Sequence, residues 1–130
     1  MVTPARKRTT SGTTISTRAL NRALLARQML LERHKLSALD AIERLVGLQA
    51  QVARPPFVGL WTRLHGFDRS ELATVLHDRR AVRVTAMRGT LHVMTTADYI
   101  AMRGAMQPML TCGMQAVLRG RCALLQLDAL

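Results

Sequence analysis

A length of 130 residues and a mass of 14.4 kDa suit one domain, and 48% apolar with only 3% aromatic residues predict a small, aliphatic core. The 19 Lys and Arg against 8 Asp and Glu give a formal net charge of +11, which indicates an anionic partner. Nucleic acid is the usual one, because Lys and Arg contacts to phosphate release counterions, and a membrane surface is the weaker alternative. Since the sequence has neither a run of about 18 apolar residues nor an apolar stretch after its opening charges, we expect no membrane span and no secretion signal.

Residues 1–16 are basic, rich in Thr and Ser and poor in apolar side chains, so we expect a disordered basic arm. No acidic residue precedes Glu32, which concentrates positive charge at this end of the chain. The arm is compatible with a solvated tail, with a segment that tracks DNA electrostatically, and with a transit peptide of similar composition.

Helical spacing of apolar residues begins at Thr17 and predicts a first helix. Ser37, with Asp40 three residues later, is a capping-box signature, and the apolar pattern after it predicts a second helix that ends near Gln49.

Pro55 and Pro56 stop that second helix and can supply the first turn of a third. The third helix has four apolar side chains spaced to pack inward, namely Phe57, Leu60, Trp61 and Leu64. After Gly66 breaks the chain, Asp68 and Glu71 repeat the capping signature and predict a short fourth helix.

Between residues 81 and 94 the spacing of apolar side chains changes from a helical period to alternation, which predicts two strands. Arg88 and Gly89 form a credible hairpin turn, because Gly supplies the positive φ that such turns need.

Thr95 and Asp98 then open a last helix, which Pro108 kinks or ends. Helices followed by a two-stranded ribbon are typical of winged-helix proteins. We therefore predict a mainly α (α+β) protein with a winged helix-turn-helix domain over residues 17–112, built from about five helices plus a β-hairpin wing.

The sequence contains no GxSxG, P-loop or GxGxxG motif. Asp40 and Glu43 lie three residues apart on one helix, where a solvated face is expected rather than an acid/base pair. The 4 His and 2 Cys show no metal-ligand spacing and no disulfide framework. We expect no metal and no cofactor.

The remaining functional prediction is that the chain binds DNA. The candidate contacts are Arg54 beside the prolines and, on the ribbon, Arg83, Arg88, Thr90 and His92. The helix before the ribbon carries Glu71 and Asp78, which phosphates repel, so recognition of an operator sequence fits poorly.

The stretch VGLQAQVARPP, residues 46–56, contains two neutral amides, Gln49 and Gln51, in a strongly basic chain. One interpretation is that they cap free carbonyls at the end of the second helix. The other comes from a resemblance. GLQAQ, followed at residues 83–103 by RVTAMRGTLHVMTTADYIAMR, resembles the AlkZ/YcaQ family of winged-helix bacterial DNA glycosylases, and the resemblance covers residues 20–109.

The resemblance implies tandem winged-helix modules plus a C-terminal β-barrel, which form a cradle for duplex DNA. The family's catalytic signature is Gln, an aliphatic residue, then Gln or Asp, so the resemblance implies that Gln49 and Gln51 are catalytic. It also implies the branch close to AlkZ, which removes N7-alkylated purines. Such a base already carries a positive charge and needs little general-acid help, so amide dipoles can stabilise an oxocarbenium-like sugar and position water.

Members of the family are several hundred residues long, whereas this sequence stops at Leu130. LQLDAL, residues 125–130, is similar to the point where the next module begins. We therefore expect residues 113–130 to start a truncated second module, and the chain to have weak or no glycosylase activity. The alternative is a noncatalytic winged-helix DNA-binding module or transcriptional regulator. The expected partner in both cases is double-stranded DNA, and the expected location is the bacterial cytoplasm, in association with the nucleoid.

Overall fold

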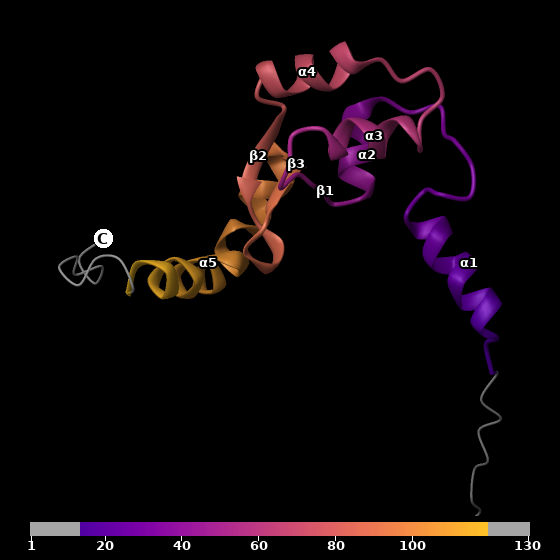
Figure 1. Cartoon of the computed structure of the whole chain (residues 1–130). Helices are drawn as coiled ribbons and strands as arrows, with labels where there is room; N and C mark the ends of the chain where they lie inside the picture. The colour runs from indigo at the N-terminus through magenta and orange to yellow at the C-terminus, as the bar shows by residue number, and fades with distance from the viewer. Residues whose placement is uncertain (1–13, 120–130) are drawn as a thin grey trace, which may run out of the picture.

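The computed structural model describes residues 14–119, which form five α-helices and a three-stranded antiparallel sheet (Figure 1). The helices are α1 (Thr17–Arg27), α2 (Ala38–Arg44), α3 (Pro55–Trp61), α4 (Arg69–His77) and α5 (Thr96–Arg119). The strands are β1 (Leu48–Gln49), β2 (Ala81–Thr85) and β3 (Leu91–Thr95), and a short 3-10 turn, η1 (Met87–Gly89), joins β2 to β3. This mixed α+β arrangement is winged-helix-like, as predicted. Most of the expected arm and of the expected second module falls outside the described residues.

Two helices begin at the caps that the sequence predicts. The Ser37 hydroxyl accepts a hydrogen bond from the Asp40 amide at 3.1 Å and begins α2. The Thr95 hydroxyl accepts from the Asp98 amide at 3.0 Å and donates to the Asp98 carboxylate at 2.7 Å, just before α5. Each cap satisfies a backbone donor that has no partner within the helix.

Asp68 and Glu71, the predicted capping pair of α4, bind the backbones of two different helices. Asp68 caps α4 by accepting from the Ser70 amide at 2.7 Å. The hydrogen bond from the Ser70 hydroxyl, and to a smaller extent the one from the Ser70 amide, lowers the pKa of the Asp68 carboxyl. Glu71 instead accepts from the Ala38 amide at 2.6 Å, so it connects α4 to the first turn of α2.

The prediction that the second helix reaches Gln49 is wrong, because α2 ends at Arg44. Val46 has φ 63° and Gly47 has φ 139°, and these left-handed residues turn the chain out of the helix. Leu48 and Gln49 then pair with β3. The apolar residues of this stretch match helical spacing, but pairing with the sheet overrides that local pattern.

The sheet has the order β1-β3-β2, so the predicted two-stranded ribbon has a third strand. Strand β1 is only two residues long, which is too short to give an alternating sequence signal. The central position of β3 also buries four successive residues, His92 to Thr95, where the sequence predicts alternation. A strand covered on both faces carries no solvent-facing row.

Helices cover both faces of the sheet. On one face, Val93 and Ala81 belong to a buried cluster with residues from α2, α3 and α4, among them Ile42, Leu60 and Leu72. On the other face, Met94 and Val84 pack with Met106 and other residues of α5. The candidate site residues in and beside β1 therefore lie at the edge of a sheet whose two faces are both covered by helices.

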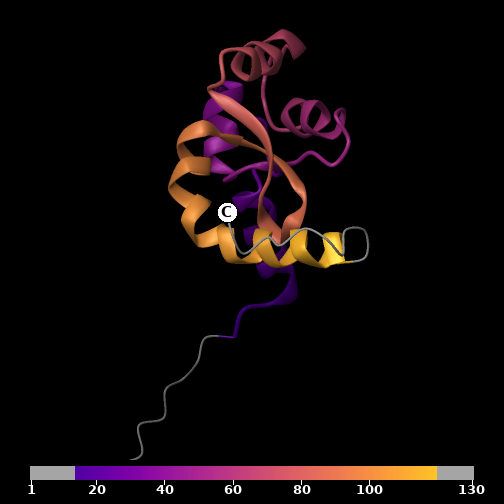
Figure 2. The same cartoon turned by 90° about the vertical axis from the view of Figure 1, so that its left-hand side faces the viewer.

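Helix α5 runs past Pro108 to Arg119 and changes direction along its length (Figure 2). The proline ring removes a backbone donor and crowds the carbonyl of Gly104, four residues earlier, which explains the bend. Of the two predicted outcomes, a kink is confirmed and an end is not. Among the described residues, no helix is long and apolar enough to cross a membrane.

Helix α1 extends away from the rest of the structure, and none of its residues is buried (Figure 1). Its C-terminal end is attached through Arg63, whose Nε donates to the Gln28 carbonyl at 2.7 Å and whose Nη1 donates to the Gly59 carbonyl at 2.8 Å. Burial lowers the pKa of the Arg63 guanidinium. Met29, which follows Gln28 in the chain, is fully buried and belongs to the main core cluster.

Candidate amide site and nucleic-acid interface

The GLQAQ stretch forms edge strand β1 and the turn that follows it. Gln49 lies in the strand, Ala50 is fully buried, and Gln51 begins the loop that leads to α3. Both Gln side chains are exposed. The buried Ala50 between them explains why a small apolar residue suits this position, since it packs in the same cluster as Leu60 and Val93.

The Gln51 side chain supplies the acceptor for the last hydrogen bond between the GLQAQ stretch and β3. The Ala50 amide donates to the Leu91 carbonyl at 2.7 Å, and the Leu91 amide in turn donates to Oε1 of Gln51 at 3.1 Å. The Gln51 amide group is therefore held by the backbone of β3, not by the end of a helix. The interpretation of the two glutamines as caps of the second helix is wrong for Gln51, because α2 ends before β1 begins.

Arg83 holds the backbone of the same turn from the opposite edge strand. Its Nε donates to the Ala50 carbonyl at 2.9 Å and its Nη2 donates to the Gln51 carbonyl at 3.2 Å. The sequence assigns Arg83 to DNA, whereas in the structure its guanidinium spans from β2 to the residue that carries the anchored amide. Its role in this geometry is to position Gln51.

Gln49 is the more accessible of the two amides. It pairs with His92, which pairs with Val84, so the three side chains share one face of the sheet. Val84 packs against α5 on that face, whereas Gln49 is exposed at its edge. The two amides thus differ: Gln51 is tied by its oxygen, and Gln49 projects from a rigid strand.

The other predicted DNA contacts fall into two groups. Arg54, before α3, and Arg88, at the hairpin tip with φ 57°, are exposed and can reach a phosphate. Thr90 donates to the Met87 carbonyl at 3.2 Å within the turn. His92 is only 6% exposed, and its Nδ1 lies 3.0 Å from the Thr90 carbonyl. Because β3 is the central strand, His92 is buried, which leaves little of its side chain for the predicted contact with DNA.

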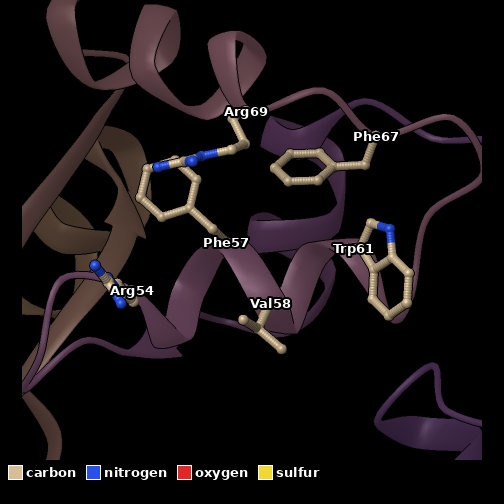
Figure 3. Close-up of a pocket in the computed structure, with 6 residues that line it drawn as sticks. All are labelled: Arg54, Phe57, Val58, Trp61, Phe67 and Arg69. Atoms are coloured by element: carbon tan, nitrogen blue, oxygen red, sulfur yellow. The ribbon is translucent and has the colours of Figure 1, made fainter.

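An open aromatic pocket lies between α3 and the start of α4, with Arg54 on its rim (Figure 3). It is lined by Arg54, Phe57, Val58, Trp61, Phe67 and Arg69. Sequence spacing predicts that Trp61 packs inward, but 55% of its surface is exposed, because α3 buries Pro56 and Leu60 instead. The signal that identifies this pocket in the sequence is the clustering of aromatic residues within residues 57–67.

Within residues 14–119, no group of three or more His, Cys, Asp or Glu could hold a metal ion. Cys112 is exposed and forms no disulfide. The side chains of the amide turn offer amide dipoles and arginine charge.

Replacing Arg83 by Gln should lower the free energy of unfolding of the chain by about 1 kcal/mol, because two hydrogen bonds of an exposed charged group are lost. Urea denaturation followed by circular dichroism measures this change, and hydrogen exchange at the Leu91 amide should accelerate as the turn loosens. Arg88→Gln, which removes the same charge at the hairpin tip, is the matched control. Equal effects of the two substitutions would contradict the positioning role of Arg83.

Comparison with known proteins identifies the family of this chain. The family model described as DNA glycosylase AlkZ-like matches residues 42–129, more than half of the chain. Among solved structures, Streptomyces sahachiroi DNA glycosylase AlkZ is similar, with 35% sequence identity and a TM-score of 0.50. That match covers 55% of this chain and 19% of the AlkZ chain, and no curated protein matches. Because this family model covers more than half of the chain, the chain belongs to the AlkZ-like DNA glycosylase family.

Proposed function

We propose that this chain supplies the amide-bearing winged-helix module of a DNA glycosylase that excises N7-alkylated purines from double-stranded DNA. The observation that carries the proposal is the arrangement of GLQAQ, in which Gln51 is anchored to the Leu91 amide and Gln49 is exposed on the adjoining strand. Membership of the AlkZ-like family supports base excision as the reaction.

The two amides have different tasks in this proposal. Excision breaks the bond between the sugar C1′ and the purine nitrogen, and the base leaves with the electron pair, which neutralises the positive charge that alkylation gave it. The oxygen of a water molecule then bonds to C1′ and its proton passes to solvent. Gln49, which faces outward, contacts the sugar or the water, while the anchored Gln51 presents a fixed dipole beside it. One preorganised dipole of this kind contributes roughly 3 to 4 kcal/mol to the transition state elsewhere.

Positive charge supplies the grip on duplex DNA. Arg54 and Arg88 are exposed near the ends of the amide turn and the hairpin, and the whole chain carries a net charge of +11. Contacts of this kind act on phosphates without reading sequence, as a scanning repair enzyme requires, and they weaken as salt rises. Such a protein works in the bacterial cytoplasm, on the DNA of the nucleoid. We also propose that residues 113–130 lead into a second winged-helix module.

A chimera tests the proposal, because the matched segment corresponds to 19% of the S. sahachiroi enzyme. This chain replaces the matching segment of that enzyme, and release of free N7-methylguanine from a duplex is measured. We expect release by the chimera, and its loss in the double variant Gln49→Ala, Gln51→Ala, while salt-dependent binding of the duplex persists.

The control is a double variant with two other amides removed, Gln28→Ala and Gln107→Ala, which should keep excision. A folded chimera that binds the duplex but releases no base would indicate instead a noncatalytic DNA-binding module. Unchanged release by the variant without Gln49 and Gln51 would exclude these two residues as the site.

A further inference from the structure

Three of the four aromatic residues of the chain line a single open pocket (Figure 3). They are Phe57, Trp61 and Phe67, and the sequence contains only one further aromatic residue, Tyr99. The pocket has a volume of about 390 Å³, which is within the range of small-ligand sites. A chain with 3% aromatic residues has therefore gathered most of its π surface in one place.

The aromatic walls are rigid and partly open. Phe57 and Phe67 are half-buried and pack against the main core cluster, which fixes their rings. Trp61 and Val58 lie at the outer side, where 55% and 57% of their surfaces are exposed. The pocket thus offers flat apolar surface to a ligand without a need to rearrange the core.

Arginines surround this surface. The Arg69 guanidinium lies over the Phe57 ring, 5.5 Å from its centre, and Arg33 lies over the Trp61 ring at 4.5 Å. Arg54 forms another part of the rim. A guanidinium is planar, so it can lie over a ring and still direct its N–H groups towards an anion.

We propose that this pocket binds one unpaired nucleotide of a DNA strand. The base stacks on the aromatic surface, and Arg54 and Arg69 bind the neighbouring phosphates. The charge and the shape favour this occupant: every base has a π face that an aromatic side chain can cover, and every nucleotide brings the negative charge that two arginines require. A base inside a duplex is covered by its stacked neighbours, so only an unpaired nucleotide can enter.

The pocket is separate from the amide turn but adjoins it in the chain. Arg54 follows Gln51 by three residues and stands between the amide turn and the first turn of α3. A strand opened beside the amides can therefore place a neighbouring nucleotide here. Binding of a nucleotide in the pocket does not require base excision, so it can be tested independently of the proposed glycosylase activity.

Trp61 provides a direct measurement, because it is the only Trp of the chain and lies in the pocket. The 130-residue chain is titrated with a ten-nucleotide oligodeoxythymidylate at low salt, and tryptophan fluorescence is followed. We expect saturable quenching as a base stacks beside the indole, and much weaker quenching with a blunt ten-base-pair duplex of the same charge per strand.

Arg69→Gln should raise the dissociation constant for the oligonucleotide about tenfold. Arg103→Gln is the matched control, since Arg103 also stacks on an aromatic ring, 5.8 Å from the centre of Tyr99, but on α5. The control should change the dissociation constant by less than about twofold, the size of a single exposed charge contact. The Gln49→Ala, Gln51→Ala variant should quench like the unmodified chain, which distinguishes this site from the amide site.

Three outcomes would overturn the proposal. One is binding, seen by anisotropy of a labelled oligonucleotide, without a change in Trp61 fluorescence. Another is an equal loss of affinity in the Arg69 and Arg103 variants, which would indicate nonspecific charge. The third is a fluorescence change that depends on protein concentration alone, which would indicate that the pocket is a contact between protein surfaces.

Discussion

Gln49→Ala is expected to slow base release in the chimeric enzyme by about 10²- to 10³-fold while leaving the stability of the protein unchanged. Gln49 is exposed and lies on an edge strand, so its truncation removes a dipole without opening the core. Gln51→Ala should also slow release, but with a second effect. The Leu91 amide loses its acceptor, which lowers the free energy of unfolding by about 1 kcal/mol.

Single-turnover release of N7-methylguanine and urea denaturation, measured on the same variants, separate the two effects. Gln51→Glu keeps an acceptor oxygen and should recover the stability that Gln51→Ala loses. If Gln49→Ala and Gln51→Ala destabilise the protein equally, the anchored and exposed amides are not distinct. If Gln49→Ala leaves the rate of release unchanged, Gln49 does not face the substrate.

Gly47→Ala is expected to lower the free energy of unfolding of the 130-residue chain by about 2 to 4 kcal/mol. Gly47 has φ +139°, a backbone conformation that side chains rarely permit. A Cβ atom at this position would meet Met94 Cγ at 2.9 Å and the Val93 carbonyl oxygen at 3.1 Å. Because Met94 is fully buried and cannot move aside, we expect β1 to shift and to carry Gln49 with it.

Gly89→Ala is the matched comparison, because Gly89 also has a positive φ, +70°, but nothing lies within 4 Å of the added Cβ. It should cost only the conformational part, about 1 kcal/mol. Thermal and urea unfolding of both variants measure the difference. Equal costs would contradict the close approach of Gly47 to β3, and in the chimeric enzyme Gly47→Ala should slow excision more than Gly89→Ala.

The helix starts and the hairpin turn could be predicted from the sequence, because each depends on residues only a few positions apart. Ser37 and Thr95 begin helices because their hydroxyls accept from amides three residues later, and Gly89 turns the hairpin because its φ is positive. The pattern also singled out Gln49 and Gln51 as candidate site residues, and their catalytic role stays a prediction; the pattern did not predict what surrounds them. The amide that anchors Gln51 belongs to Leu91, 40 residues away, and no periodicity reports a contact at that separation.

The sequence by itself determined where α2, α4 and α5 begin, the hairpin and the strong positive charge, because these depend on composition or on residues close together in the chain. Only the tertiary structure decided that GLQAQ is an edge strand and not a helix end, that Arg83 holds its turn, and that His92 is buried in a central strand. The physical reason is that hydrogen bonds across a sheet and burial between helices join distant residues, and these long-range interactions outweigh the weak helical preference of a short apolar stretch.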